Sequence, residues 1–74
     1  MKITWTWAHK IFIEHGFELI TKSSVGGVIS SHYRHPTGVD IDYYTVPDFS
    51  EHFKHAGVKH GYVRLPSYIK SLGL

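Results

Sequence analysis

Residues 26–46 limit the possible folds of this chain more than any other segment. Two stretches of alternating polar and apolar residues flank Pro36, Thr37 and Gly38, which is the pattern of a β-hairpin. A three-residue hairpin loop ends in a left-handed residue, a conformation that glycine adopts readily, and Gly38 stands at that position. The segment therefore predicts two antiparallel strands joined by a short turn.

The register of this hairpin follows from the need to bury one of its faces. A three-residue loop separates apolar and polar side chains onto opposite faces, whereas a two-residue loop would place Tyr33 opposite Asp40 and mix them. We therefore predict the three-residue loop. The resulting polar face carries two cross-strand pairs, Arg34 with Asp40 and His32 with Asp42.

The residues before the hairpin predict a helix followed by a strand. One stripe recurs at helical spacing and should be buried: Trp7, Ala8, Ile11, Phe12 and His15. Trp5 lies off that stripe, and Gly16 is a natural helix stop. Residues 17–22 alternate and predict a first strand with Phe17 and Leu19 facing inward.

The residues after the hairpin predict a second helix. Asp48 stands at the N-cap, with Glu51 at the reciprocal position of a capping box, and Gly57 ends the pattern. Three apolar residues between them recur at helical spacing: Phe49, Phe53 and Ala56. We therefore expect a helix from Asp48 to the glycine.

The C-terminal residues predict a short final helix that begins at Pro66 and stops at Gly73. Residues 58–65, which precede it, predict a loop or a short edge strand. The predicted fold is α+β, a small single domain over residues 1–74. It has a three-stranded antiparallel sheet packed by helices, in the order α-β-β-β-α plus the short C-terminal helix.

Composition narrows the classes of function. A chain of 74 residues buries only around 60% of its unfolded surface, so its stability is marginal and a homodimer would be a natural means of stabilisation. It has no cysteine, which excludes disulfides and thiolate zinc sites and is compatible with a reducing cytoplasm. No apolar run approaches the roughly 20 residues that span a bilayer, and no signal peptide is evident. We expect a cytoplasmic protein without a membrane partner.

The polar hairpin face is the first candidate site. His32 beside Asp42 could act as a general acid or base, because the carboxylate would orient the imidazole ring. Arg34 could hold a phosphate, and Tyr44 could stack on a base or donate a hydrogen bond. The competing interpretation is a solvent-facing sheet whose ion pairs are inert.

The histidines do not predict a metal site. His32 and His35 lie three apart on a strand and therefore point to opposite faces. His52 and His55 would share one side of the predicted helix but would need a third ligand. The candidates for that ligand are His60 and Glu51. We expect no metal and no other cofactor.

Basic and aromatic residues interleave in the C-terminal third. Such a pattern favours a nucleic-acid or partner-binding surface, although a solvated basic face has the same composition. The candidate contact residues are Lys54, Lys59, Tyr62 and Arg64. The formal net charge of +2 is a weak basic bias rather than the charge of a DNA-binding arm.

Several short motifs together resemble the HicA toxin family. They are H-G-F-E-L after the first helix, S-H-Y-R-H-P-T-G in the hairpin, T-V-P after it, and the terminal L-P-S-Y-I-K-S-L-G-L. The resemblance implies a small mRNA interferase with a double-stranded-RNA-binding-domain-like α-β-β-β-α fold, an antitoxin partner and no metal. Residues 48–62 look like an insertion before the last helix.

The resemblance also implies a catalytic histidine on the second strand, preceded by glycine and serine. In this chain the glycines are Gly26 and Gly27, and the nearest match is Ser31 followed by His32. The implied catalytic role is therefore transferred to His32.

Two functions from different classes follow. The first is an RNA-binding and RNA-cleaving domain of the toxin type, with RNA and an antitoxin as partners. The alternative is a non-catalytic phage or mobile-element inhibitor, such as an anti-CRISPR protein, which binds a host protein through Trp5, Tyr44 and Tyr62. A plain RNA-binding module without chemistry is a weaker third.

Overall fold

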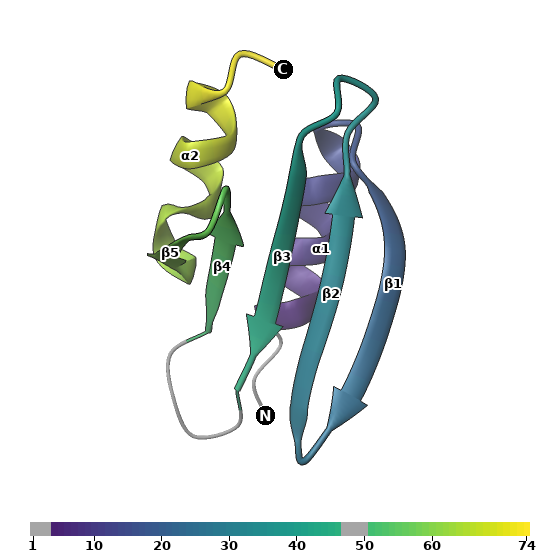
Figure 1. Cartoon of the computed structure of the whole chain (residues 1–74). Coiled ribbons are helices and arrows are strands. Elements are labelled where there is room, and N and C mark those ends of the chain that lie inside the picture. Colours follow the sequence, from purple (N-terminus) through teal and green to yellow (C-terminus); the bar gives the residue numbers. More distant parts are fainter. Residues whose placement is uncertain (1–3, 47–50) are drawn as a thin grey trace.

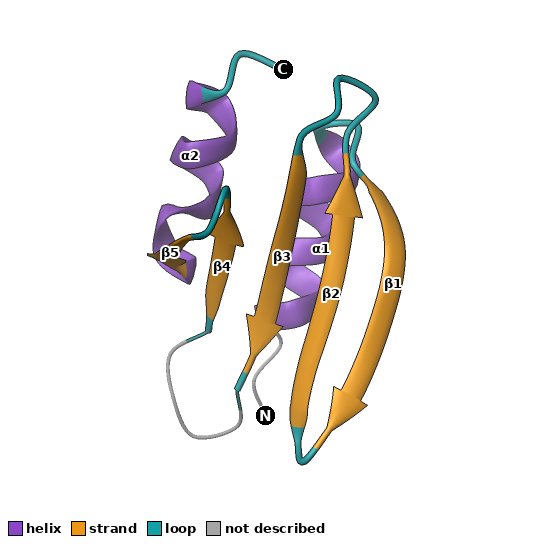
Figure 2. Ribbon diagram, in the orientation of Figure 1, coloured by secondary structure: helices purple, strands orange, loops and turns teal. Residues whose placement is uncertain are grey.

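The hairpin predicted over residues 26–46 forms two inner strands of a five-stranded antiparallel sheet in the computed structural model (Figure 1). The structure describes residues 4–46 and 51–74. The strands are β1 (Glu18–Val25), β2 (Val28–Arg34), β3 (Asp40–Thr45), β4 (His52–His55) and β5 (Val58–Gly61), and they pair in chain order. The flanking elements in Figure 2 are α1 (Thr4–Glu14), a 3-10 turn η1 (Tyr62–Arg64) and α2 (Leu65–Ser71).

The predicted register of β2 and β3 is confirmed. Tyr33 pairs with Ile41, and His32 pairs with Asp42. Gly38 adopts the left-handed conformation that the three-residue loop requires, with φ +96°. The α+β class of the fold is confirmed as well.

The helix predicted from Asp48 to Gly57 is wrong, and so is the limit of three strands. Asp48 and Phe49 lie outside the described residues, and the segment that follows forms the β4–β5 hairpin. Its two-residue turn holds both Ala56 (φ +53°) and Gly57 (φ +80°) in the left-handed region, as a type I′ turn requires. Alanine seldom adopts that conformation, so the Ala-Gly pair is more typical of a helix end than of a hairpin.

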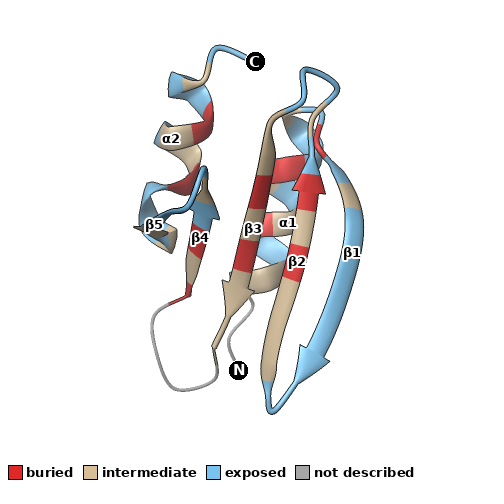
Figure 3. Ribbon diagram, viewed as in Figure 1, coloured by how far each residue is buried: buried red, intermediate tan, exposed pale blue. Residues whose placement is uncertain are grey.

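Both helices pack on one face of the sheet, and their buried residues form a single core with those of the strands. Figure 3 shows buried residues on α1, α2, β2, β3 and β4. From α1, Phe12 stacks on Tyr33 with ring centroids 4.0 Å apart. From α2, Tyr68 lies 5.2 Å from Phe53, which pairs across strands with Tyr43 on the same face. The buried apolar residues are Ala8, Phe12, Phe17, Tyr33, Ile41, Tyr43, Phe53, Leu65 and Ile69. No described element covers the opposite face.

Helix α1 is rotated relative to the predicted stripe. Ala8 and Phe12 are buried as expected, but Trp7 is 36% exposed, while Trp5 packs against the core. Trp5 Nε1 donates a hydrogen bond to the buried Ser31 Oγ at 2.7 Å. Residues 5, 8 and 12 also follow helical spacing, so Trp5 shares the buried side of α1 with Ala8 and Phe12.

The first strand is longer than predicted, because β1 continues beyond residue 22 to Val25; the remaining predictions of secondary structure agree with the structure. Phe17 is buried and Leu19 is half-buried on the core side of β1. The segment before the last helix contains the edge strand β5, and Pro66 lies in the first turn of α2. Gly73, just after α2, has φ +70°, as a helix stop should. Within the described residues, no helix has both the length and the apolar character needed to cross a membrane.

Candidate functional site on the open sheet face

The face of the sheet away from the helices, here called the open face, is built from alternate residues of each strand. The register aligns them in rows that cross the sheet. We call one of these rows the polar row; it consists of Thr21, His32, Asp42, Lys54 and Lys59. The neighbouring row consists of Ser23, Ser30, Tyr44, His52 and Gly61.

His32 and Asp42 form a hydrogen-bonded dyad at the middle of the polar row. His32 Nδ1 lies 2.6 Å from Asp42 Oδ1, and the side chains are 27% and 43% exposed. Because an ionised carboxylate only accepts hydrogen bonds, Nδ1 carries the proton. In the neutral ring Nε2 then has a free lone pair. No hydrogen bond to Nε2 is seen within residues 4–46 and 51–74.

Arg34 and Asp40 stand beside the dyad on the same face. Arg34 Nε donates a hydrogen bond to Asp40 Oδ1 at 2.9 Å, and that bond holds the pKa of Asp40 below its ordinary value. The same carboxylate oxygen lies 3.7 Å from His32 Nε2. Among the described contacts of Arg34 the guanidinium uses only Nε, so its terminal nitrogens are available for an anion.

Tyr44 and His52 form a ring stack next to the lysines of the polar row. Their centroids are 4.9 Å apart at an interplanar angle of 20°. The Lys54 ammonium lies 5.7 Å from the centre of the Tyr44 ring. Burial, followed by the charges of Lys59 and Lys54, lowers the pKa of His52. This imidazole therefore binds a proton less readily than an ordinary histidine.

The structure gathers most of the sequence-predicted residues on the open face. They are His32, Asp42, Arg34, Tyr44, Lys54 and Lys59. Tyr62 and Arg64 do not join them, because both lie in η1. The Tyr62 ring packs edge-on against Trp7 of α1, with centroids 6.0 Å apart, so it faces the helix side.

Sequence reasoning did not assign His52 to this site. It placed His52 and His55 on one side of a helix, but on strand β4 they point to opposite faces of the sheet. His52 stacks on Tyr44 on the open face, whereas the ring of His55 forms a hydrogen bond with the hydroxyl of Tyr68 on the helix side. Strand alternation in the four residues His52–His55 was the only signal for this placement. The part of the chain that the structure describes contains no cluster of three or more histidine, aspartate or glutamate residues that could hold a metal.

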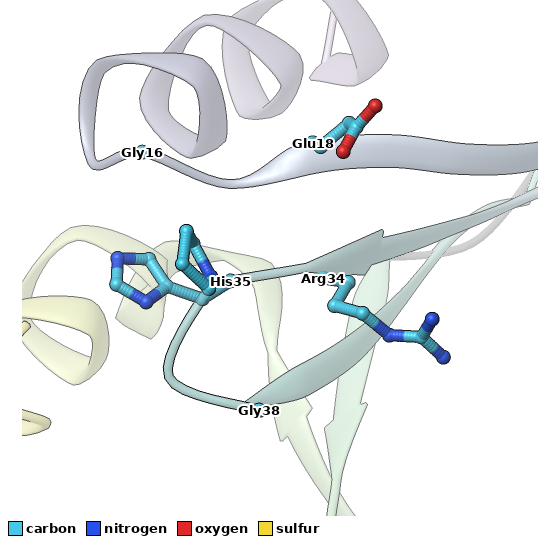
Figure 4. Close-up of a pocket in the computed structure, with 6 residues that line it drawn as sticks. Gly16, Glu18, Arg34, His35 and Gly38 are labelled. Carbon is cyan, nitrogen blue, oxygen red and sulfur yellow. The ribbon is translucent and has the colours of Figure 1, made fainter.

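A pocket of about 240 Å³ lies at the end of the β2–β3 hairpin (Figure 4). It is lined by Gly16, Glu18, Arg34, His35, Pro36 and Gly38. The side chains of Arg34 and His35 point in different directions in Figure 4, and neither His32 nor Asp42 lines the pocket. The chemistry of the open face therefore does not depend on this cavity.

Neither a family model, nor a curated protein, nor a solved structure matches this chain. The geometry of the open face is therefore the basis for any inference about function. That geometry places an oriented histidine, an arginine with available terminal nitrogens and two neighbouring lysines on one uncovered surface.

Proposed function

We propose that this chain is a small RNA-directed domain of the HicA toxin type, which cleaves RNA through His32. The observation that carries the proposal is the 2.6 Å hydrogen bond between His32 Nδ1 and Asp42 Oδ1 on a sheet face that no described element covers. An aspartate that fixes the tautomer of a partly exposed histidine is a recurrent arrangement for general acid–base catalysis.

The proposed reaction is attack of a ribose 2′-oxygen on the adjacent phosphorus. His32 Nε2 takes the 2′-hydroxyl proton as the P–O2′ bond forms, and Asp42 stabilises the resulting imidazolium. The imidazolium then returns a proton to the departing 5′-oxygen as the P–O5′ bond breaks. The products are a 2′,3′-cyclic phosphate and a 5′-hydroxyl, and no metal takes part.

Arg34 is the group that would stabilise the charge on the reacting phosphate. It lies two residues from His32 on β2, which corresponds to about 7 Å along one face of a strand. Its Nε is held by Asp40, so the guanidinium is fixed in direction while its terminal nitrogens remain available. A planar donor set held in this way suits bidentate contact with phosphate oxygens.

The order of the elements also supports the family that the motifs resemble. The β4–β5 hairpin lies within the segment that looks like an insertion in the sequence. Without that hairpin the order is α1-β1-β2-β3-α2, which is the α-β-β-β-α order expected of a HicA-like domain. A protein antitoxin that covers the open face would then be the expected partner.

The proposal can be tested with purified protein and in growing cells. Induction of the wild type should arrest growth and yield RNA fragments with 2′,3′-cyclic phosphate ends, and His32→Ala should abolish both effects. His15→Ala is the matched control, because His15 follows α1 on the other side of the sheet and its side chain bonds only the carbonyl of Ile11 among the described contacts. Intact RNA after incubation with a folded wild-type protein would overturn the proposal.

A second candidate is a non-catalytic inhibitor that binds a host protein. The exposed apolar side chains on the helix side favour it: Trp7 packs against Tyr62 and remains 36% exposed, and the adjacent Val63 is 70% exposed. Trp5 is a poor anchor for a partner, because its indole N–H donates a hydrogen bond to Ser31 and the Lys22 ammonium lies over its ring. A tight protein complex that is lost in Trp7→Ala, together with intact RNA, would favour this function.

A further inference from the structure

On the open face, the charged side chains of β2 and β3 form ion pairs, whereas the two lysines of β4 and β5 form none with any described residue. The carboxylates of β3 are both paired, Asp42 with His32 and Asp40 with Arg34. Lys54 and Lys59 are directly opposite each other on β4 and β5, and neither forms an ion pair with any described residue. Like charges opposite each other destabilise a sheet. A bound anion between the two ammonium groups would remove that repulsion.

An aromatic platform adjoins these lysines. Tyr44 and His52 stack in the neighbouring row, and the Lys54 ammonium lies over the Tyr44 ring. Gly61 ends that row, and a Cβ atom built there would meet nothing within 4 Å, so space is open beside His52. A planar group can therefore approach the two rings from the edge of the sheet. A base that stacks on aromatic rings beside cationic groups is the usual arrangement for single-stranded nucleic acid.

We infer that the open face binds a single strand of RNA, with one base on the Tyr44–His52 stack and a phosphate between Lys54 and Lys59. The inference rests on the proposed RNA-directed function and names the form of its substrate. From the lysines the strand passes along the polar row, through Asp42, to His32. Neighbouring strands lie about 4.8 Å apart, so His32 is about 14 Å from Lys59 along this row.

The same geometry disfavours an RNA duplex on this face. A stacking platform needs a base that is free of its neighbours, whereas the bases of a duplex are paired and stacked inside the helix. Double-stranded RNA is recognised by shape and through contacts across the minor groove. The helices α1 and α2, which could enter such a groove, lie on the opposite side of this sheet.

Binding can be measured without cleavage. The probe is a fluorescent 2′-O-methyl RNA of about 12 nucleotides, within the site sizes typical of single-strand binding, used alone and annealed to its complement. The variants are Tyr44→Ala and Lys59→Gln, with Tyr44→Phe and Lys70→Gln as matched controls. Tyr44→Phe keeps the ring, and Lys70 is an exposed lysine of α2. Circular dichroism verifies that each variant is folded.

We expect the single strand to bind more tightly than the duplex. Tyr44→Ala should weaken binding of the single strand by roughly 5- to 100-fold, the range for loss of one stacked base, while Tyr44→Phe should change it little. Lys59→Gln should reduce the slope of log affinity against log salt by about 1, and Lys70→Gln should leave that slope unchanged.

Three outcomes would overturn the inference: tighter binding of the duplex, unchanged binding in Tyr44→Ala and Lys59→Gln, or equal competition by an acidic polypeptide. The cleavage assay separates this inference from the proposed function. RNA cleavage that requires His32 but is unaffected by Tyr44→Ala and Lys59→Gln would keep the catalytic proposal and reject the binding mode. Single-strand binding through Tyr44 and Lys59 without any cleavage would keep the binding mode and reject the catalytic proposal.

Discussion

The β2–β3 and β4–β5 hairpins have the same topology, yet only the first was predicted from the sequence. Pro36, Thr37 and Gly38 mark the first turn with residues that suit it, and six or seven alternating residues flank the turn on each side. The second hairpin has strands of four residues and places an alanine in a left-handed position. The residue types of the turn and the length of the strands together therefore determine whether a hairpin can be predicted from its sequence.

Phe53 shows why the second hairpin was mistaken for a helix. The spacing of Phe49, Phe53 and Ala56 matches a helical period, but alternation also places Phe53 on the buried side of a strand. A four-residue strand offers too few positions for the two periods to be distinguished. Pairing with Tyr43 of β3 and packing against α2 favour the strand, and these contacts are not visible in local sequence.

The largest expected effect is on the rate of RNA cleavage, and it should distinguish a catalytic β2–β3 hairpin from an RNA-binding β4–β5 hairpin. Asp42→Asn keeps the shape of the side chain but removes the negative charge beside His32 that, in the proposed mechanism, stabilises the imidazolium. The cleavage rate at saturating RNA should fall roughly 10²- to 10⁴-fold, the usual contribution of general acid–base catalysis. His52→Ala, in the second hairpin, should instead raise mainly the RNA concentration needed for half-maximal rate. Steady-state kinetics of both variants test this division, and a reversed pattern would contradict it.

The next effect concerns stability. Phe53→Ala should lower the free energy of unfolding by about 3–5 kcal/mol, because a buried phenyl ring is lost and a cavity remains. The control is Val58→Ala on the edge strand β5, where the side chain is 54% exposed and the change should be within about 0.5 kcal/mol. Urea unfolding measures both. Similar small losses in the two variants would mean that β4 is not part of the core.

The pairing of His32 with Asp42 was predictable, because the turn at one end of the hairpin and the need to bury one face together fix the register of β2 and β3. Once Tyr33 must face inward and Gly38 must end the loop, His32 can only lie opposite Asp42. The same reasoning placed Arg34 beside them. No tertiary information was needed, because all of these residues belong to one local hairpin.

The rest of the candidate site depended on contacts between distant segments. Lys54 and Lys59 reach the open face only because β4 pairs with β3, and His52 joins Tyr44 for the same reason. Tyr62 and Arg64 are near them in sequence, yet the chain leaves the sheet after Gly61 and carries both away. Interleaved basic and aromatic residues therefore indicated a surface but not which residues share it.

A smaller effect on stability is expected from substitutions in the two hairpin turns. Ala56→Gly should raise the free energy of unfolding by about 0.5–1 kcal/mol. Removing a left-handed alanine relieves about 1–2 kcal/mol of strain, but glycine loses more backbone entropy on folding, which offsets part of this gain. Gly38→Ala, in the other hairpin, should lower it by about 1–2 kcal/mol for the same reason. Thermal unfolding of the two variants gives the shifts. A loss of stability in Ala56→Gly would show that the second turn is not strained.

The smallest effect concerns the pKa of His52. Burial and the charges of Lys59 and Lys54 hold this pKa below the ordinary value of 6.5. Lys59→Gln should raise it towards 6.5 without restoring that value, because burial, the largest cause, remains. Titration of the His52 ring by NMR measures the shift, and Lys70→Gln, which removes a lysine of α2, should leave it unchanged.

The sign of the accompanying change in stability follows from proton linkage. Because the folded chain holds the pKa of His52 below 6.5, the unfolded chain binds more protons as the pH falls below that value. The contribution of His52 to the free energy of unfolding is therefore full above pH 6.5 and is lost as the pH falls through its folded-state pKa. In Lys59→Gln this loss should be smaller than in the wild type. A phosphate bound between Lys54 and Lys59 should act in the same direction, so 2′-O-methyl RNA should raise the pKa of His52 in the wild type and raise it less in Lys59→Gln.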